Sequence, residues 1–153
     1  MSHRCLSARG CWDGVQMDAT WGRTLELRIP ADTRYLSLVR RGVRSLAESA
    51  GFPREDVADV EVAVSEAVTN SVMHGSPDRD SSAVFVKCSA AGDCIVVEVE
   101  DQSAAQSLSP QPEECGPSEE KGRGVLIMHQ LMDECSNCRT ERGIRVRMAK
   151  QRR

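Results

Sequence analysis

The chain has 153 residues, of which 40% are hydrophobic and 28% charged. This size and composition predict one globular domain rather than a disordered chain or two compact units. The formal net charge is −3 and aromatic residues make up only 3%, which argues against direct nucleic-acid binding. No apolar run approaches the roughly 18 residues of a membrane span and no signal peptide is expected, so we predict a cytoplasmic protein without membrane contact.

The first half of the sequence predicts one strand and two helices. Residues 1–22 lack periodicity and are expected to form a flexible N-terminal extension. Residues 24–29 alternate between apolar and polar side chains, which is typical of a strand with one buried face. Asp32 is a candidate N-cap for a helix that runs to about residue 50. A second helix is predicted over residues 55–73.

Three later segments alternate as strands do. Residues 83–88 and 94–100 are separated by Ala-Ala-Gly-Asp, which predicts a β-hairpin, and residues 144–148 predict a last strand. The two arginines of this last strand belong to a basic stretch, residues 139–153. We interpret them as the solvent-facing side of an edge strand, where charge discourages association. A docking surface for an acidic partner is the alternative.

A long segment without periodicity precedes the last predicted helix. Residues 102–121 are rich in Ser, Pro, Gln and Glu, and a loop of that length is typical of a functional lid or of disorder. A third helix is predicted from Gly122 to about Cys135. The order of elements favours an α+β fold with a mainly antiparallel sheet and helices on one face. The domain is expected to cover residues 23–150, followed by a short tail at 151–153.

Three parts of this arrangement carry residues suited to a nucleoside triphosphate. Glu66 and Asn70 lie one helical turn apart and offer a general base and a neutral oxygen ligand for Mg²⁺. Asp101, directly after a strand, can accept a hydrogen bond from the amino group of adenine. Gly122 and Gly124, at the start of the third helix, would let phosphates approach backbone N–H groups. Each feature alone is also typical of a solvated helix face or a turn, and only their joint occurrence favours the site.

Two of these segments carry a family resemblance. Residues 65–75, Ser-Glu-Ala-Val-Thr-Asn-Ser-Val-Met-His-Gly, resemble the N-box of the bacterial anti-sigma factor serine/threonine kinases. Those kinases belong to the superfamily of histidine kinase-like, gyrase and MutL ATPase domains. Residues 122–128, Gly-Arg-Gly-Val-Leu-Ile-Met, resemble the second glycine box of the same family. The resemblance extends from about Leu25 to Lys150.

The resemblance implies a fold and an activity. The fold would be the two-layer α/β sandwich of that superfamily, with a mixed, mostly antiparallel sheet. The protein would bind ATP with Mg²⁺, form a homodimer and hold a sigma factor inactive. It would also phosphorylate a serine of an anti-anti-sigma protein of the STAS type.

The resemblance also implies roles for individual residues. Glu66 matches the general base, Asn70 the Mg²⁺ ligand and Asp101 the adenine-binding acid. Gly122 and Gly124 match the phosphate loop.

Three basic residues complete the implied site. Lys121 and Arg123 are candidates for a cation that approaches the phosphates from the lid. Arg40, in the first helix, matches the position that contacts partner proteins in such kinases.

Two motifs depart from the family's pattern. Its first glycine box reads Asp-x-Gly-x-Gly, and here Ser103 and Ala105 replace the glycines with residues that resist positive φ. Its Gly-Thr near the C-terminus is here Gly143–Ile144, whose side chain cannot hydrogen-bond adenine. Losing that bond costs about 1–3 kcal/mol, or about tenfold or more in affinity. A second hypothesis is therefore a non-catalytic, partner-binding regulator on the same fold, with weak or lost ATP binding.

The sequence holds seven cysteines, an odd number. Without an export signal, reduced thiols are expected. Cys135 and Cys138 form a single Cys-x-x-Cys, which Cys115 and His129 could complete as a metal site. A thiol or metal sensor is therefore a third hypothesis.

Overall fold

The structure is a computed structural model, and it describes residues 23–76, 78, 81–103 and 119–153. The predicted extension over residues 1–22 and most of the predicted lid, residues 104–118, lie outside the described residues. Side chains between Glu119 and Gly122 are likewise outside the description.

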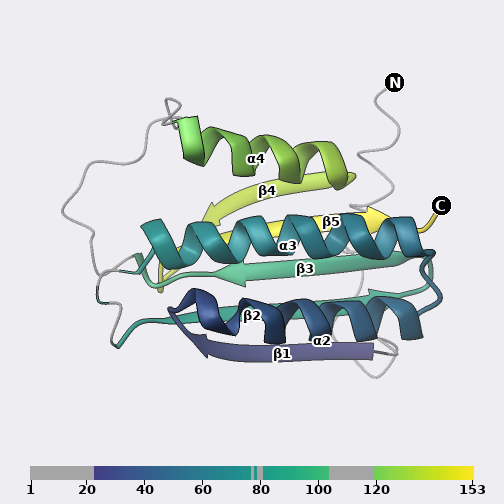
Figure 1. Cartoon of the computed structure of the whole chain (residues 1–153), viewed down its shortest axis with the longest axis horizontal. Helices are drawn as coiled ribbons and strands as arrows, with labels where there is room; N and C mark the ends of the chain where they lie inside the picture. Colours follow the sequence, from purple (N-terminus) through teal and green to yellow (C-terminus); the bar gives the residue numbers. More distant parts are fainter. Residues whose placement is uncertain (1–22, 77, 79–80, 104–118) are drawn as a thin grey trace.

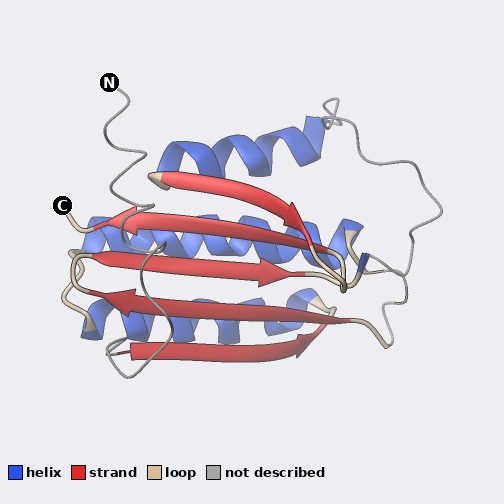
Figure 2. Ribbon diagram, turned by 180° about the vertical axis from the view of Figure 1, so that it is seen from behind, coloured by secondary structure: helices blue, strands red, loops and turns tan. Residues whose placement is uncertain are grey.

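Five strands form one sheet in the order β1-β2-β3-β5-β4, and every neighbouring pair is antiparallel (Figure 2). The strands are β1 (Arg23–Pro30), β2 (Ala83–Ala91), β3 (Cys94–Glu100), β4 (Glu134–Arg139) and β5 (Ile144–Gln151). The helices are α2 (Leu36–Ser49), α3 (Arg54–His74) and α4 (Glu119–Leu131), and the short 3-10 helix η1 (Thr33–Tyr35) leads into α2. All of them lie on one face of the sheet (Figures 1 and 2). The predicted two-layer α+β fold is confirmed.

Local sequence signals explain the first elements. The Asp32 carboxylate accepts a hydrogen bond of 2.9 Å from the backbone N–H of Arg34 and caps η1, as predicted. Gly51, at φ +82°, follows α2 and permits the turn toward α3. Gly92, at φ +56°, forms the tight turn between β2 and β3.

The core lies between the sheet and the helices. Val60, Val64 and Val68 of α3 are at most 1% exposed, and strand residues such as Ile95 and Val97 are completely buried beneath them. Full burial of such side chains stabilises the fold by about 1.5–3 kcal/mol each. The apolar positions of the predicted strands are therefore those that face the helices. The opposite, open face carries charged residues instead.

Two expectations for the last third of the chain are wrong. The third helix begins at Glu119 and ends at Leu131, so Gly122 and Gly124 lie inside it rather than at its start. A strand that the sequence analysis did not predict, β4, follows the helix. It escaped prediction because Glu-Cys-Ser-Asn-Cys-Arg lacks the apolar alternation of a half-buried strand.

The new strand changes the position of β5. Strand β4 forms the sheet edge, and β5 lies between β3 and β4. The interpretation of Arg145 and Arg147 as the wet side of an edge strand is therefore wrong. Arg145 instead pairs across the sheet with Glu100 of β3, at 2.8 Å between Nη2 and Oε2.

A buried lysine links the end of α4 to α3. Lys150 is 2% exposed, and its Nζ donates to the carbonyl of Leu131, the last residue of α4, at 2.7 Å. The same Nζ lies 3.0 Å from Oδ2 of Asp59 on α3. Pairing of this kind compensates the cost of burying an ammonium group.

None of the helices in the described part of the chain has the length and apolarity of a membrane span.

Candidate functional site

One end of the candidate site lies where α3 and α4 pack together. Glu66 and Asn70 are half-buried on α3, and Gly124 of α4 is buried. A Cβ atom added to Gly124 would lie 2.9 Å from Oε2 of Glu66 and 3.3 Å from Nδ2 of Asn70. The predicted acid and amide therefore lie together, directly against the backbone of α4. Glycine at position 124 leaves the space that any side chain would take.

The position of Gly124 inside the helix gives it a different local role from the predicted one. An α-helix leaves only the N–H groups of its first turn without intrahelical partners, and α4 begins at Glu119. Gly124 lies beyond them, and its contribution is the absence of a side chain. Arg123 is exposed, and the side chain of Lys121 lies outside the description.

The other end of the candidate site is Asp101, which is 8% exposed and follows β3. Its Oδ1 accepts hydrogen bonds of 2.9 Å from the backbone N–H groups of Ser103 and Ile144. The N–H of Asp101 in turn donates to the carbonyl of Ile144 at 3.1 Å. Backbone groups therefore fix the orientation of this carboxylate. Among the described residues, no donor bonds Oδ2.

Two glycines enclose Asp101 and were not predicted as site residues. A Cβ atom at Gly75 would collide with Oδ2 of Asp101, and one at Gly143 would collide with Oδ1. Gly75 follows α3, and its carbonyl accepts a hydrogen bond of 3.2 Å from the N–H of Gln102. The N-box pattern includes Gly75 but indicates only a helix end, and nothing local to Gly143 signals a contact with Asp101.

The two ends of the site are connected by α3. A helix rises about 1.5 Å per residue, which places Asn70 about 7–8 Å and Glu66 about 13–14 Å from Gly75 along the axis. The carboxylate of Asp101, a hydrogen-bond acceptor, thus lies at one end, and Glu66 and Asn70 lie at the other. At each end a glycine lets the acidic side chain lie directly against the backbone.

The departures from the family's motifs have unequal consequences. No residue other than glycine adopts positive φ in the described part of the chain, so Ser103 occupies its place without backbone strain. Ala105 lies outside the description. Ile144 contributes its backbone N–H to Asp101, but its side chain supplies no hydroxyl. The hydroxyl of Thr140 accepts from the N–H of Gly143 within the turn, at 3.2 Å.

The remaining predicted residue, Arg40, is remote from these two ends. It is exposed on α2, and α2 lies on the other side of α3 from α4 (Figure 1). It therefore lies on a helix that contributes to neither end of the candidate site.

The cysteine pair does not form a joint site. Cys135 lies opposite Met148 and Cys138 opposite Arg145 in the register of β4 and β5, and alternation puts the two thiols on opposite faces of the strand. Within the described ranges, no three His, Cys, Asp or Glu side chains are placed to bind a metal. Burial raises the pKa of the Cys135 thiol, and raises that of Cys88 to about 12. Cys115 lies outside the description.

Comparison with known proteins places this fold and site in a class. A family model described as the histidine kinase-like ATPase domain matches residues 29–150, most of the chain. The serine-protein kinase RsbW of Bacillus velezensis is 31% identical over 135 residues, which span 82% of this chain and 84% of the relative. RsbW of Listeria monocytogenes serotype 4a is 33% identical over 125 residues, 76% of this chain and 80% of the relative.

Solved structures agree on the fold. The RsbU and RsbW domains of Rv1364c from Mycobacterium tuberculosis match with a TM-score of 0.65 at 22% identity, over 85% of this chain and 32% of that one. A histidine kinase domain from Erythrobacter litoralis EL346 matches with a TM-score of 0.53 at 25% identity, over 80% of this chain and 61% of that one. The chain therefore belongs to the histidine kinase-like ATPase family, in the branch of the bacterial anti-sigma factor serine kinases.

Proposed function

We propose that the protein is an anti-sigma factor with serine kinase activity. It binds ATP with Mg²⁺, sequesters a sigma factor and phosphorylates a serine of a STAS-type anti-anti-sigma protein. The observation that carries the proposal is the meeting of Glu66 and Asn70 at Gly124, with the backbone-held carboxylate of Asp101 at the other end of α3. The similarity to RsbW serine-protein kinases supports it. Sigma factors work in the cytoplasm, so that is the proposed location.

Each residue of the site has a chemical task. When bound, ATP supplies the γ-phosphoryl group and Mg²⁺ neutralises part of its charge. The protein therefore needs mainly to position the reacting groups. Asp101 accepts a hydrogen bond from the adenine amino group through Oδ2. The amide oxygen of Asn70 is a Mg²⁺ ligand. Glu66 takes the proton of the attacking serine hydroxyl as general base.

The start of α4 completes the phosphate end. Gly122 lies near the start of α4, where the helix dipole favours anions. Gly124 lets Glu66 and Asn70 lie directly against the backbone of α4. Lys121 or Arg123 is the proposed source of positive charge for the phosphates.

We assign the binding of a partner protein to α2. We also propose that the protein forms a homodimer. Arg40 is exposed on α2, and Arg41 and Arg44 beside it are exposed as well. An exposed basic helix attracts an acidic partner surface. The homodimer is proposed from family membership.

A second candidate function is a non-catalytic regulator on the same fold. It is favoured by Ile144, whose side chain cannot supply the hydroxyl that the family uses to hold adenine. In that case the protein binds its sigma factor through its surface and does not transfer phosphate.

A phosphotransfer assay separates the two functions. The protein is mixed with Mg²⁺, γ-labelled ATP and a STAS-type protein from the same organism, with the antagonist's serine replaced by alanine as the control. The kinase function predicts label on the antagonist and none on its alanine variant. Sigma-factor binding without any transfer would contradict the kinase function and support the regulator.

A further inference from the structure

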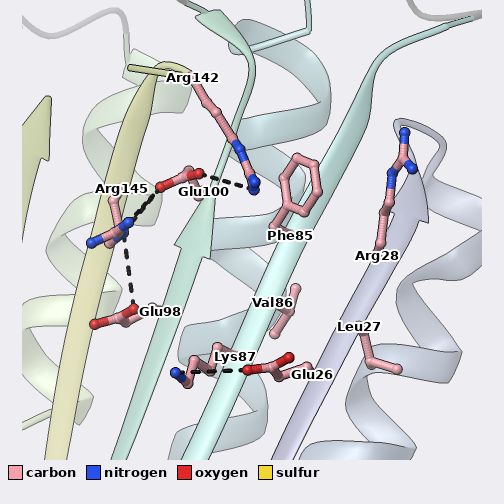
Figure 3. Close-up of a pocket in the computed structure, with 10 residues that line it drawn as sticks. All are labelled: Glu26, Leu27, Arg28, Phe85, Val86, Lys87, Glu98, Glu100, Arg142 and Arg145. Carbon is pink, nitrogen blue, oxygen red and sulfur yellow. Dashed lines mark hydrogen bonds and ion pairs between the residues drawn. The ribbon is translucent and has the colours of Figure 1, made fainter. Parts of the chain in front are cut away.

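The open face of the sheet carries a groove of about 390 Å³. At one end of it, the guanidinium of Arg142 lies 4.2 Å from the centre of the Phe85 ring, and Nη1 lies 3.4 Å from Oε1 of Glu100 (Figure 3). Glu100 is 7% exposed and also accepts from Nη2 of Arg145, at 2.8 Å. Arg142 therefore binds the turn between β4 and β5 to side chains of β2 and β3.

The same turn holds Asp101 from its other side. Ile144, two residues after Arg142, donates its N–H to Oδ1 of Asp101. Gly143, between them, packs so tightly on Asp101 that a Cβ atom would collide with the carboxylate. Glu100 and Asp101 are themselves consecutive. In this short segment, Arg142 therefore contacts the open-face groove, and Gly143 and Ile144 contact the buried carboxylate of Asp101.

Other contacts within the turn do not anchor it to the rest of the sheet. The N–H of Thr140 donates to the carbonyl of Gly143 at 2.7 Å, and the N–H of Gly143 donates to the Thr140 hydroxyl. These bonds close the turn on itself. Beyond the backbone ladder of β5, the pair of Arg145 with Glu100 and the bond of Ile144 to Asp101, Arg142 adds side-chain contacts that join the turn to β2 and β3.

We propose that Arg142 is a positioning residue for the adenine-binding carboxylate. By stacking on Phe85 and pairing with Glu100, it sets the place of the Ile144 N–H and so the direction of Asp101. This inference rests on the proposed function, because it takes Asp101 as the acceptor for adenine. It makes the open-face groove, on the far side of the sheet from the helices, a determinant of nucleotide recognition.

The test compares three variants of the full chain. Arg142→Ala removes the clamp, and Arg142→Lys keeps the charge beside Glu100 and over the ring. Arg139→Ala, an exposed arginine of the same hairpin, is the matched control. Binding of a non-hydrolysable ATP analogue and of the corresponding GTP analogue is measured by calorimetry with Mg²⁺. Hydrogen exchange of the Ile144 amide is measured without nucleotide.

A specific pattern is expected. Arg142→Ala weakens binding of the ATP analogue about three- to tenfold, the size of a cation–π contact together with an exposed ion pair. It lowers the preference for the ATP over the GTP analogue by a similar factor and speeds exchange at Ile144. Arg142→Lys restores most of the preference, and Arg139→Ala changes neither quantity. A merely destabilised fold would not change the ratio of the two affinities.

Two outcomes overturn the inference. If wild-type protein binds the ATP analogue and Arg142→Ala keeps both the affinity and the preference, Arg142 does not position Asp101, and the proposed function stands. If wild-type protein binds neither analogue, the proposed function fails and this inference fails with it.

Discussion

The two ends of the candidate site are built by different means. At the end proposed for the adenine base, called the base end below, Asp101 is held by backbone N–H groups and enclosed by two glycines. Three strand or helix ends converge on it. At the phosphate end, Glu66 and Asn70 are side chains of one helix that meet another helix at a glycine. The base end is thus fixed by the sheet, whereas the phosphate end exists only where α4 docks on α3. Substitutions at the two ends should leave different signatures.

The largest effect is expected from Glu66→Gln at the phosphate end. Removing a general base typically lowers the rate of the chemical step about 10²–10⁴-fold. The amide keeps the size of the side chain, so analogue binding and thermal stability should stay within about twofold and about 0.5 kcal/mol of wild type. Transfer at the parent rate in a labelled-phosphate assay would show that Glu66 is not the base.

Asp101→Asn tests the base end and should act on binding. The amide can still accept from Ile144, but its NH₂ group replaces Oδ2, the proposed acceptor for the adenine amino group. A lost hydrogen bond to a charged group costs about 1.5–3 kcal/mol, or about 10- to 100-fold in affinity. Calorimetry with ATP and GTP analogues should show weaker ATP binding and a lost preference for adenine. An unchanged preference would remove Asp101 from the site.

Gly124→Ala separates site geometry from stability. Alanine is favoured over glycine inside a helix by about 1 kcal/mol, so α4 itself should gain stability. The new methyl would lie 2.9 Å from Oε2 of Glu66, and that flexible side chain must move. We expect analogue binding or transfer to fall about three- to tenfold, an effect of about 1 kcal/mol, without a lower melting temperature. Leu126→Ala, an exposed position on the same helix, is the control.

The smallest effect is expected from Cys138→Ser. Cys138 is exposed, and its partner in the Cys-x-x-Cys motif lies on the other face of β4. Nucleotide affinity should therefore change less than about twofold, well under 1 kcal/mol, with or without added Zn²⁺. A metal-dependent change in affinity that this variant abolishes would revive the sensor hypothesis.

The sequence predicts the common face of Glu66 and Asn70 but not the enclosure of Asp101, for a physical reason. Glu66 and Asn70 lie four residues apart on one helix, so their common face follows from the helical period. The grip on Asp101 comes from Gly75, Gly143 and Ile144, which are distant in sequence and act through backbone atoms. No side-chain pattern reports such contacts.

The fold shows the same division. The sequence predicts the strands with apolar alternation and the helices with an apolar face, because burial of one face requires apolar residues at a regular spacing. Strand β4 was missed, since it is a polar edge strand that forms by pairing with β5. The start of α4 was placed too late because Glu119, Glu120 and Lys121 continue the polar composition of the preceding segment.

The central claim is that Asp101 and the pair Glu66–Asn70 belong to one ATP site. Calorimetric titration with a non-hydrolysable ATP analogue, with Mg²⁺ and after its removal by EDTA, tests it most directly in wild-type protein and in Asn70→Ala. The account predicts micromolar binding that requires Mg²⁺ in wild type and is lost in Asn70→Ala. Equal binding by the two proteins, or no binding by either, would contradict it.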